Sequence, residues 1–111
     1  MKKSCPKSER NIRMAKKIIW SPLSQNDFIS ILNYLQENWD ATVVQGFIEI
    51  ISSSVSQISN NPKQFPLIYK NKKIRKCVLT KHNSLYYRDR KEFVDILRIY
   101  DNRQDPKKLL I

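Results

Sequence analysis

Glycine is almost absent from this sequence: Gly46 is the only one among 111 residues. A dinucleotide-binding turn and a phosphate-binding loop each need several residues without a Cβ, because the backbone there approaches a phosphate closely. One glycine cannot supply such a loop. The sequence therefore excludes Rossmann-type dinucleotide enzymes and P-loop nucleotide hydrolases.

Cysteine and histidine are also scarce, with Cys5, Cys77 and His82 as the complete set. A structural zinc site takes four Cys or His ligands, so we expect no metal site, and we expect no cofactor. Cys77 lies in an apolar segment and is predicted to be a reduced core thiol, and Cys5 is predicted to be reduced as well.

Long hydrophobic runs are missing. No stretch of about 18 apolar residues occurs, and the polar segment 4–10 stands where a secretory signal would have its apolar part. We therefore expect a cytoplasmic protein. The composition, 41% hydrophobic, fits one small domain over residues 16–111, preceded by a flexible basic arm at residues 1–15. Met14 is an alternative translation start.

Charge is abundant and uneven: 21 Lys and Arg stand against 10 Asp and Glu, a formal net charge of +11. Residues 1–20 hold seven basic and one acidic residue, residues 21–61 four acidic and no basic residue, and residues 62–111 fourteen basic and five acidic residues. The excess of positive charge at both ends of the sequence creates an electrostatic potential that attracts polyanions and acidic proteins. The sequence predicts a negatively charged macromolecular partner.

Two amphipathic helices are predicted in the middle of the chain. Ser24 followed by Asp27 resembles a capping box, and Asp40 is suited to cap a second helix that ends at Asn60-Asn61-Pro62. Apolar residues recur at helical spacing in both helices. In the first they are Phe28, Ile31, Leu32, Leu35 and Trp39, and in the second Val44, Phe47, Ile48, Ile51, Val55 and Ile58. We expect a helical hairpin with one apolar side.

Short segments rich in β-branched and aromatic residues predict strands at 16–20, 74–80, 85–88 and 93–100. The last three are joined by turn-length connections and form an antiparallel meander. The fold class is therefore α+β in the order β-α-α-β-β-β, with the helical hairpin on one face of a small, mainly antiparallel four-stranded sheet. We expect the first strand to lie beside the last.

Residues able to do chemistry lie in the C-terminal half. Side chains alternate along a strand, so Arg98 and Tyr100 lie on the same face. Guanidinium groups bind phosphates and carboxylates, and aromatic rings stack on bases, so this face could bind RNA or an acidic protein equally well. His82 is either a solvated turn residue or a general base. The full set is Arg75, Lys81, His82, Tyr86, Tyr87, Arg88, Arg98, Tyr100 and Arg103.

Residues 16–110 resemble the RelE/ParE toxins of bacterial type II toxin–antitoxin modules. The resemblance rests on the order of elements, on residues 18–24 (IIWSPLS), on Asp27 and the helix ending in Tyr34-Leu35, and above all on residues 74–88 (IRKCVLTKHNSLYYR) and 96–106 (ILRIYDNRQDP). It implies a small basic toxin that a cognate antitoxin inactivates by covering the functional face with an acidic, amphipathic segment.

The two branches of this superfamily imply different activities. The RelE branch cuts ribosome-bound mRNA with basic residues and a Tyr or His close to the C-terminus, whereas the ParE branch inhibits DNA gyrase and lacks that residue. No Tyr or His follows Arg103 here, which favours the ParE branch. The resemblance gives Arg75, Arg88 and Arg103 as the basic set, and with Lys81 and Arg98 they form the expected binding residues for target or antitoxin.

Two alternatives stay open. One is a RelE-like, metal-independent endoribonuclease with His82, Arg88 and Tyr100 as candidate catalytic residues. The other is a plain RNA-binding or structural module.

Overall fold

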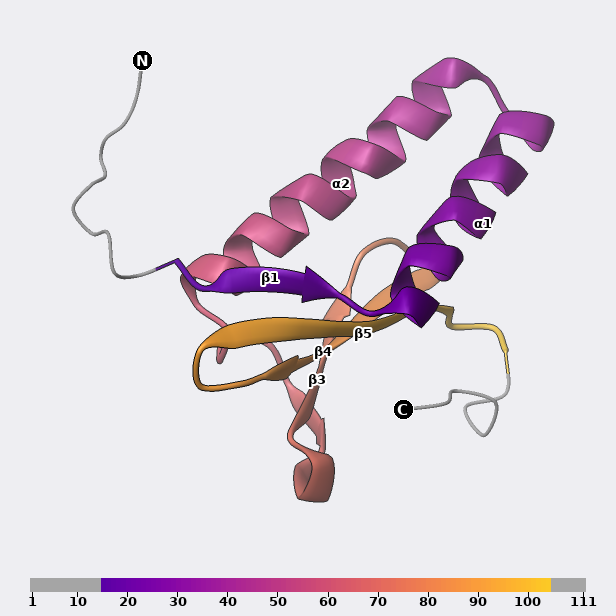
Figure 1. The fold of residues 1–111 in the computed structure, drawn as a ribbon. Coiled ribbons are helices and arrows are strands. Elements are labelled where there is room, and N and C mark those ends of the chain that lie inside the picture. The colour runs from indigo at the N-terminus through magenta and orange to yellow at the C-terminus, as the bar shows by residue number, and fades with distance from the viewer. Residues whose placement is uncertain (1–14, 105–111) are drawn as a thin grey trace, which may run out of the picture.

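Two helices cover one face of a five-stranded sheet in the computed structural model, which describes residues 15–104 (Figure 1). The helices are α1 (Pro22–Asn38) and α2 (Ala41–Asn60), and a short 3₁₀ helix, η2, spans Lys70–Lys72. The strands are β1 (Lys17–Trp20), β2 (Leu67–Tyr69), β3 (Ile74–Val78), β4 (Asn83–Asp89) and β5 (Phe93–Asp101). The α+β class is confirmed.

The sheet is mixed, with the strand order β1-β5-β4-β3-β2. As predicted, β1 lies beside β5; it runs parallel to it, from the pair Lys17–Phe93 to the pair Trp20–Ile96. The expectation of four strands is wrong, because β2 adds a fifth that pairs antiparallel with β3. Three residues directly after Pro66 are too few to show a period of two, so the sequence pattern gives no sign of β2.

The start of α1 differs from its prediction. Ser21, not Ser24, is the N-cap: its hydroxyl accepts the Ser24 N–H at 3.0 Å, and Pro22 follows at the start of the helix. Ser24 is buried and donates its own hydroxyl to the Ser21 carbonyl. Asp27 takes no part in capping, because its carboxylate binds β5.

α2 follows its prediction closely. Asp40 caps the helix by accepting the Val43 N–H at 3.1 Å, and the helix ends at Asn60. Phe47, Ile51 and Ile58 are buried. Burial of this apolar stripe outweighs the weak helix propensity of the serines between residues 52 and 56.

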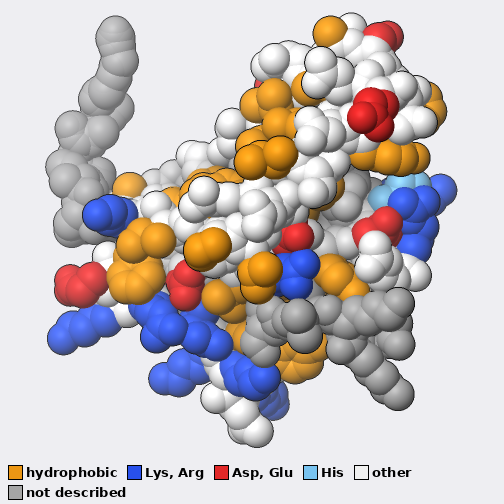
Figure 2. All heavy atoms as spheres, turned by 45° about the vertical axis from the view of Figure 1, so that its right-hand side comes forward, with side chains coloured by type: hydrophobic (Ala, Val, Ile, Leu, Met, Phe, Trp, Pro, Cys, Tyr) orange, Lys and Arg blue, Asp and Glu red, His pale blue; other side chains and the backbone are white. Residues whose placement is uncertain are grey.

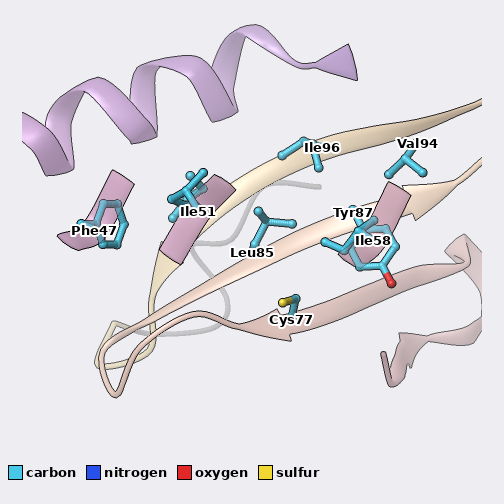
Figure 3. Packing of buried hydrophobic residues seen from close by; sticks show 9 residues of the cluster. Phe47, Ile51, Ile58, Cys77, Leu85, Tyr87, Val94 and Ile96 are labelled. Carbon is cyan, nitrogen blue, oxygen red and sulfur yellow. The ribbon is translucent and has the colours of Figure 1, made fainter. Parts of the chain in front are cut away.

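Apolar side chains fill both sides of the sheet. The larger cluster lies under the helices and includes Phe47, Ile51, Leu85, Tyr87 and Ile96 (Figure 3). Tyr87 donates its hydroxyl to the Pro62 carbonyl, and burial raises its pKa above the usual range. The smaller cluster is formed by Ile74, Tyr86 and Tyr100 with Ile68 and Leu97.

Some predicted details are confirmed and others corrected. Cys77 is buried, and burial raises the pKa of its thiol. β3 ends at Val78 and β4 starts at Asn83, because the Thr80 hydroxyl accepts the backbone N–H groups of the turn. Trp39 is the C-cap residue of α1: its N–H donates to the Leu35 carbonyl, and its side chain is 60% exposed. The prediction that Trp39 lies on the buried face of the helix is therefore wrong.

No helix within residues 15–104 is long and apolar enough to cross a membrane. Nearly all of the predicted arm, with Cys5 and Met14, lies outside the described residues, as does segment 105–111.

The burial of Phe47, on α2, leads to a first prediction. Phe47→Ala removes a ring that is 5% exposed and leaves a cavity, so the free energy of unfolding should fall by about 3–5 kcal/mol. Urea denaturation followed by circular dichroism measures the change. Ile29→Ala on α1, at a side chain that is 54% exposed, is the control and should change stability by less than about 0.5 kcal/mol. Equal stabilities of the two variants would contradict the packing.

Candidate functional site

A groove of about 810 Å³ lies between one end of the sheet and the half of the helical hairpin that includes the α1–α2 connection at residues 39–40. One wall comes from α1 and α2, and the other from the β3–β4 turn and the end of β5. Figure 2 shows the histidine at this side of the molecule, beside Lys, Arg and acidic side chains. The residues of the groove used below are Asp27, Tyr34, Trp39, Val43, Ile50, His82, Arg98, Tyr100, Asp101 and Arg103.

The helical wall presents apolar side chains to solvent. Tyr34 and Trp39 are 57% and 60% exposed, and Val43 and Ile50, each 38% exposed, line the same groove from the N-terminal half of α2. Single exposed hydrophobic residues are common on protein surfaces, whereas a group of them in one groove is typical of a site that binds another molecule.

The sheet wall is built on a half-buried ion pair between α1 and β5. Arg98 donates two hydrogen bonds to the Asp27 carboxylate, at 2.7 and 2.9 Å, and the Ile99 N–H donates a third at 3.1 Å. The hydrogen bond to Asp27 raises the pKa of Arg98. Arg98 also lies 5.8 Å from the centre of the Tyr100 ring. Its positive charge is therefore largely compensated inside the protein.

A second ion pair lies at the end of β5. Arg103 donates to both carboxylate oxygens of Asp101, at 3.0 and 2.8 Å. These bonds, and the Arg103 N–H bond to the same carboxylate, lower the pKa of Asp101 to about 2, and the nearby His82 contributes in the same direction. The Arg103 side chain remains 65% exposed.

The remaining residues of the predicted nuclease set are only partly brought together. His82 is exposed in the β3–β4 turn, and its carbonyl accepts the Asn102 N–H at 2.7 Å. Tyr100 lines the same groove but is 8% exposed and packs against Ile74 and Tyr86. Arg88 lies far from both residues.

Arg75 and Arg88 lie toward the other end of the sheet. Asn83 and Arg88 are five residues apart on β4, which separates them by about 17 Å. Arg88 donates to the Lys72 carbonyl at 2.9 Å, and Arg75 donates to the carbonyls of Phe65 and Lys63 at 2.8 and 3.3 Å. The expected binding set is thus divided: Arg98 and Arg103 line the groove, Lys81 is exposed in the turn next to it, and Arg75 and Arg88 lie elsewhere.

Sequence reasoning missed several groove residues. In the sequence, Tyr34 marks only the end of a helix, Asp27 resembles a capping residue, and Trp39 continues the apolar side of the first helix. An aromatic residue at each of two positions five apart, near a helix C-terminus, was the available signal for Tyr34 and Trp39. Asp27 gave no such signal, because Arg98 is 71 residues away.

Among residues 15–104, no group of three or more His, Cys, Asp or Glu side chains is placed to hold a metal ion.

Comparison with known proteins identifies the family. The family model described as the ParE toxin of the type II toxin–antitoxin system, parDE, matches residues 18–106, most of the chain. The chain belongs to this family of toxins.

Two solved structures share the fold. One is a chain of the chromosomal ParDE TA system from P. aeruginosa, with a TM-score of 0.64 and 15% identity over 79% of this chain and 97% of that one. The other is the conserved hypothetical protein HP0894 from Helicobacter pylori, with a TM-score of 0.53 and 20% identity over 80% of this chain and 97% of that one. No curated protein matches the sequence.

The Asp27–Arg98 ion pair predicts a graded loss of stability. Asp27→Ala leaves Arg98 and the Ile99 N–H without their acceptor and should lower the free energy of unfolding by about 2–4 kcal/mol. Asp27→Asn keeps one acceptor oxygen and should lose less. Urea denaturation of both variants tests this, and equal losses would show that the carboxylate contributes only its charge.

The Asp101–Arg103 pair predicts a pH effect. Because the pKa of Asp101 is about 2, below its usual value near 3.8, its contribution to stability is complete above pH 3.8 and is lost as the pH falls through 2. Arg103→Gln should raise this pKa toward 3.8. A carboxyl-carbon NMR titration measures it, and an unchanged pKa in the variant would refute the assigned cause.

Proposed function

We propose that this chain is a ParE-like toxin that inhibits DNA gyrase by binding, and that an antitoxin with an acidic, amphipathic segment inactivates it. Membership of the ParE toxin family supports the class of activity. The observation that carries the proposal is the groove, in which exposed apolar side chains face the exposed guanidinium of Arg103.

The two walls of the groove match the two sides of such a segment. Tyr34 and Trp39 offer apolar contact area, while Arg103 and the neighbouring Lys81 offer positive charge at the rim. α1 and α2 contain no Lys or Arg, so the helical wall is suited to the apolar side of the segment and the sheet wall to its carboxylates. The groove is the proposed antitoxin site.

A second candidate function is ribosome-dependent cleavage of mRNA. It is favoured by the placement of His82 and Tyr100 on the same groove, where a base and a cationic group lie near each other. It is weakened by the position of Arg88 near η2 and by the burial of Tyr100. Gyrase inhibition therefore remains the first proposal.

Antitoxin binding is tested at Trp39. Trp39→Ala removes an aromatic side chain that is exposed in the free protein and would become buried in the complex. The variant should bind the antitoxin encoded by the neighbouring gene at least tenfold more weakly, because aromatic residues buried on binding dominate interface energies. Isothermal titration calorimetry measures the affinity. Ile29→Ala, also on α1 but outside the groove, is the matched control. Equal affinities of both variants would contradict this site.

The target is tested with purified gyrase and with translating ribosomes. The chain should inhibit supercoiling, and Lys81→Ala with Arg103→Ala should lose most of the inhibition. Lys17→Ala with Lys91→Ala removes the same charge from exposed positions outside the groove and should retain it. Codon-positioned cuts in ribosome-bound mRNA, without an effect on gyrase, would replace the proposal with the endoribonuclease.

A further inference from the structure

One side chain, that of His82, decides the overall charge of the groove. Two carboxylates and two guanidinium groups line it, and they form the ion pairs Asp27–Arg98 and Asp101–Arg103, so their charges cancel. Among the groove residues that the structure describes, His82 is the one of the type whose charge changes between about pH 5 and pH 8. The groove is therefore neutral overall when the imidazole is neutral and carries one positive charge when it is protonated.

The β3–β4 turn fixes the backbone of His82 at the edge of the groove. The Thr80 hydroxyl accepts the His82 N–H at 3.2 Å, and the His82 carbonyl accepts the Asn102 N–H at 2.7 Å, which ties the turn to the end of β5. The residue itself is exposed, and Figure 2 shows the histidine at the surface. An exposed imidazole gains a proton without a large desolvation cost, and both of its ring nitrogens are then donors.

The charged groups around His82 determine what a partner can add. Asp101 interacts electrostatically with His82, but both of its oxygens accept from Arg103. The groove residues of α2 have no titratable side chain. In the described part of the chain, the titratable and charged groups around the groove, apart from His82, are Tyr34 and Asp27 on α1, Arg98, Tyr100, Asp101 and Arg103 in or directly after β5, and Lys81 in the turn. A carboxylate brought by a partner is thus an acceptor for the imidazolium that no arginine of this chain shares.

We propose that His82 makes the binding of the antitoxin dependent on pH: the imidazolium binds a carboxylate of the antitoxin, and the complex takes up a proton at this residue. The inference rests on the proposed function, in which the groove binds an acidic, amphipathic segment. A form of the protein that binds a ligand more tightly gains population when the ligand is present. The complex is therefore tighter at lower pH, where His82 is protonated, and weaker at higher pH, where the groove is neutral overall.

The pH effect adjusts the affinity and is not required for binding. The apolar contacts of Tyr34 and Trp39 do not change with pH, and Arg103 keeps its charge because the Asp101 carboxylate raises its pKa further. A carboxylate that moves the titration midpoint of His82 upward by about one pH unit changes the affinity by at most about tenfold. This limit sets the size of the expected effect.

The test is calorimetric titration of the full chain, without a histidine tag, with the antitoxin encoded by the neighbouring gene at pH 6, 7 and 8 and constant ionic strength. The affinity should be about three- to tenfold higher at pH 6 than at pH 8. His82→Gln, which is neutral throughout, should bind at all three pH values with the weaker affinity, and His82→Lys, which is charged throughout, with the stronger one. Titratable groups of the antitoxin act equally on all three proteins, so the difference between them reports on His82.

An NMR titration gives a second readout. His82 is the only histidine of the chain, so isotope-labelled protein gives one imidazole signal, both free and with unlabelled antitoxin. Its titration midpoint should move to higher pH in the complex. The same pH dependence in His82→Gln as in the unmodified chain, a tighter complex at pH 8 than at pH 6, or an unmoved midpoint would each overturn the inference.

Trp39→Ala distinguishes the two proposals. If this variant binds the antitoxin more weakly while pH has no effect that depends on His82, the antitoxin site stands and the pH inference fails. If the antitoxin does not bind the unmodified chain at any of the three pH values, both proposals fail.

Discussion

The Asp27 carboxylate joins the helical hairpin to the sheet, and the position of the groove depends on it. β1 pairs with β5 only as far as Ile96, so the edge of β5 beyond that residue lacks a strand partner. Ser21 bonds to the carbonyl of Ile96 and, through its hydroxyl, to that of Leu97, and Asp27 accepts the Ile99 N–H. α1 thus replaces a strand at this edge and fixes the angle at which the hairpin extends over the groove.

The structure also separates two kinds of arginine that look alike in sequence. Arg98 and Arg103 are paired with carboxylates, which fixes their side chains and raises the pKa of both guanidinium groups. Arg75 and Arg88 instead donate to backbone carbonyls, of Phe65 and Lys72. Arginines of the same sequence half therefore differ in their partners: Arg98 and Arg103 line the groove with carboxylates beside them, whereas Arg75 and Arg88 lie toward the other end of the sheet.

Much of the fold was predictable because the relevant signals are local. The spacing of Phe47, Ile51 and Ile58 predicts the buried face of α2, and Asp40 predicts its start. The predictions failed where a distant residue decides the outcome. Asp27 resembles a capping residue until Arg98 is placed beside it, and Trp39 continues the apolar stripe of α1 although the helix there extends past the sheet.

The sequence by itself determined the two helices, the meander of β3, β4 and β5, the excess of positive charge and the resemblance to the toxin family, since periodicity, composition and motifs are properties of neighbouring residues. Tertiary structure alone decided which arginines are paired with carboxylates, that Tyr34 and Trp39 remain exposed, and that His82, Arg98 and Arg103 meet at one groove while Arg75 and Arg88 do not. The physical reason is that charge compensation and burial depend on distances through space between residues far apart along the chain.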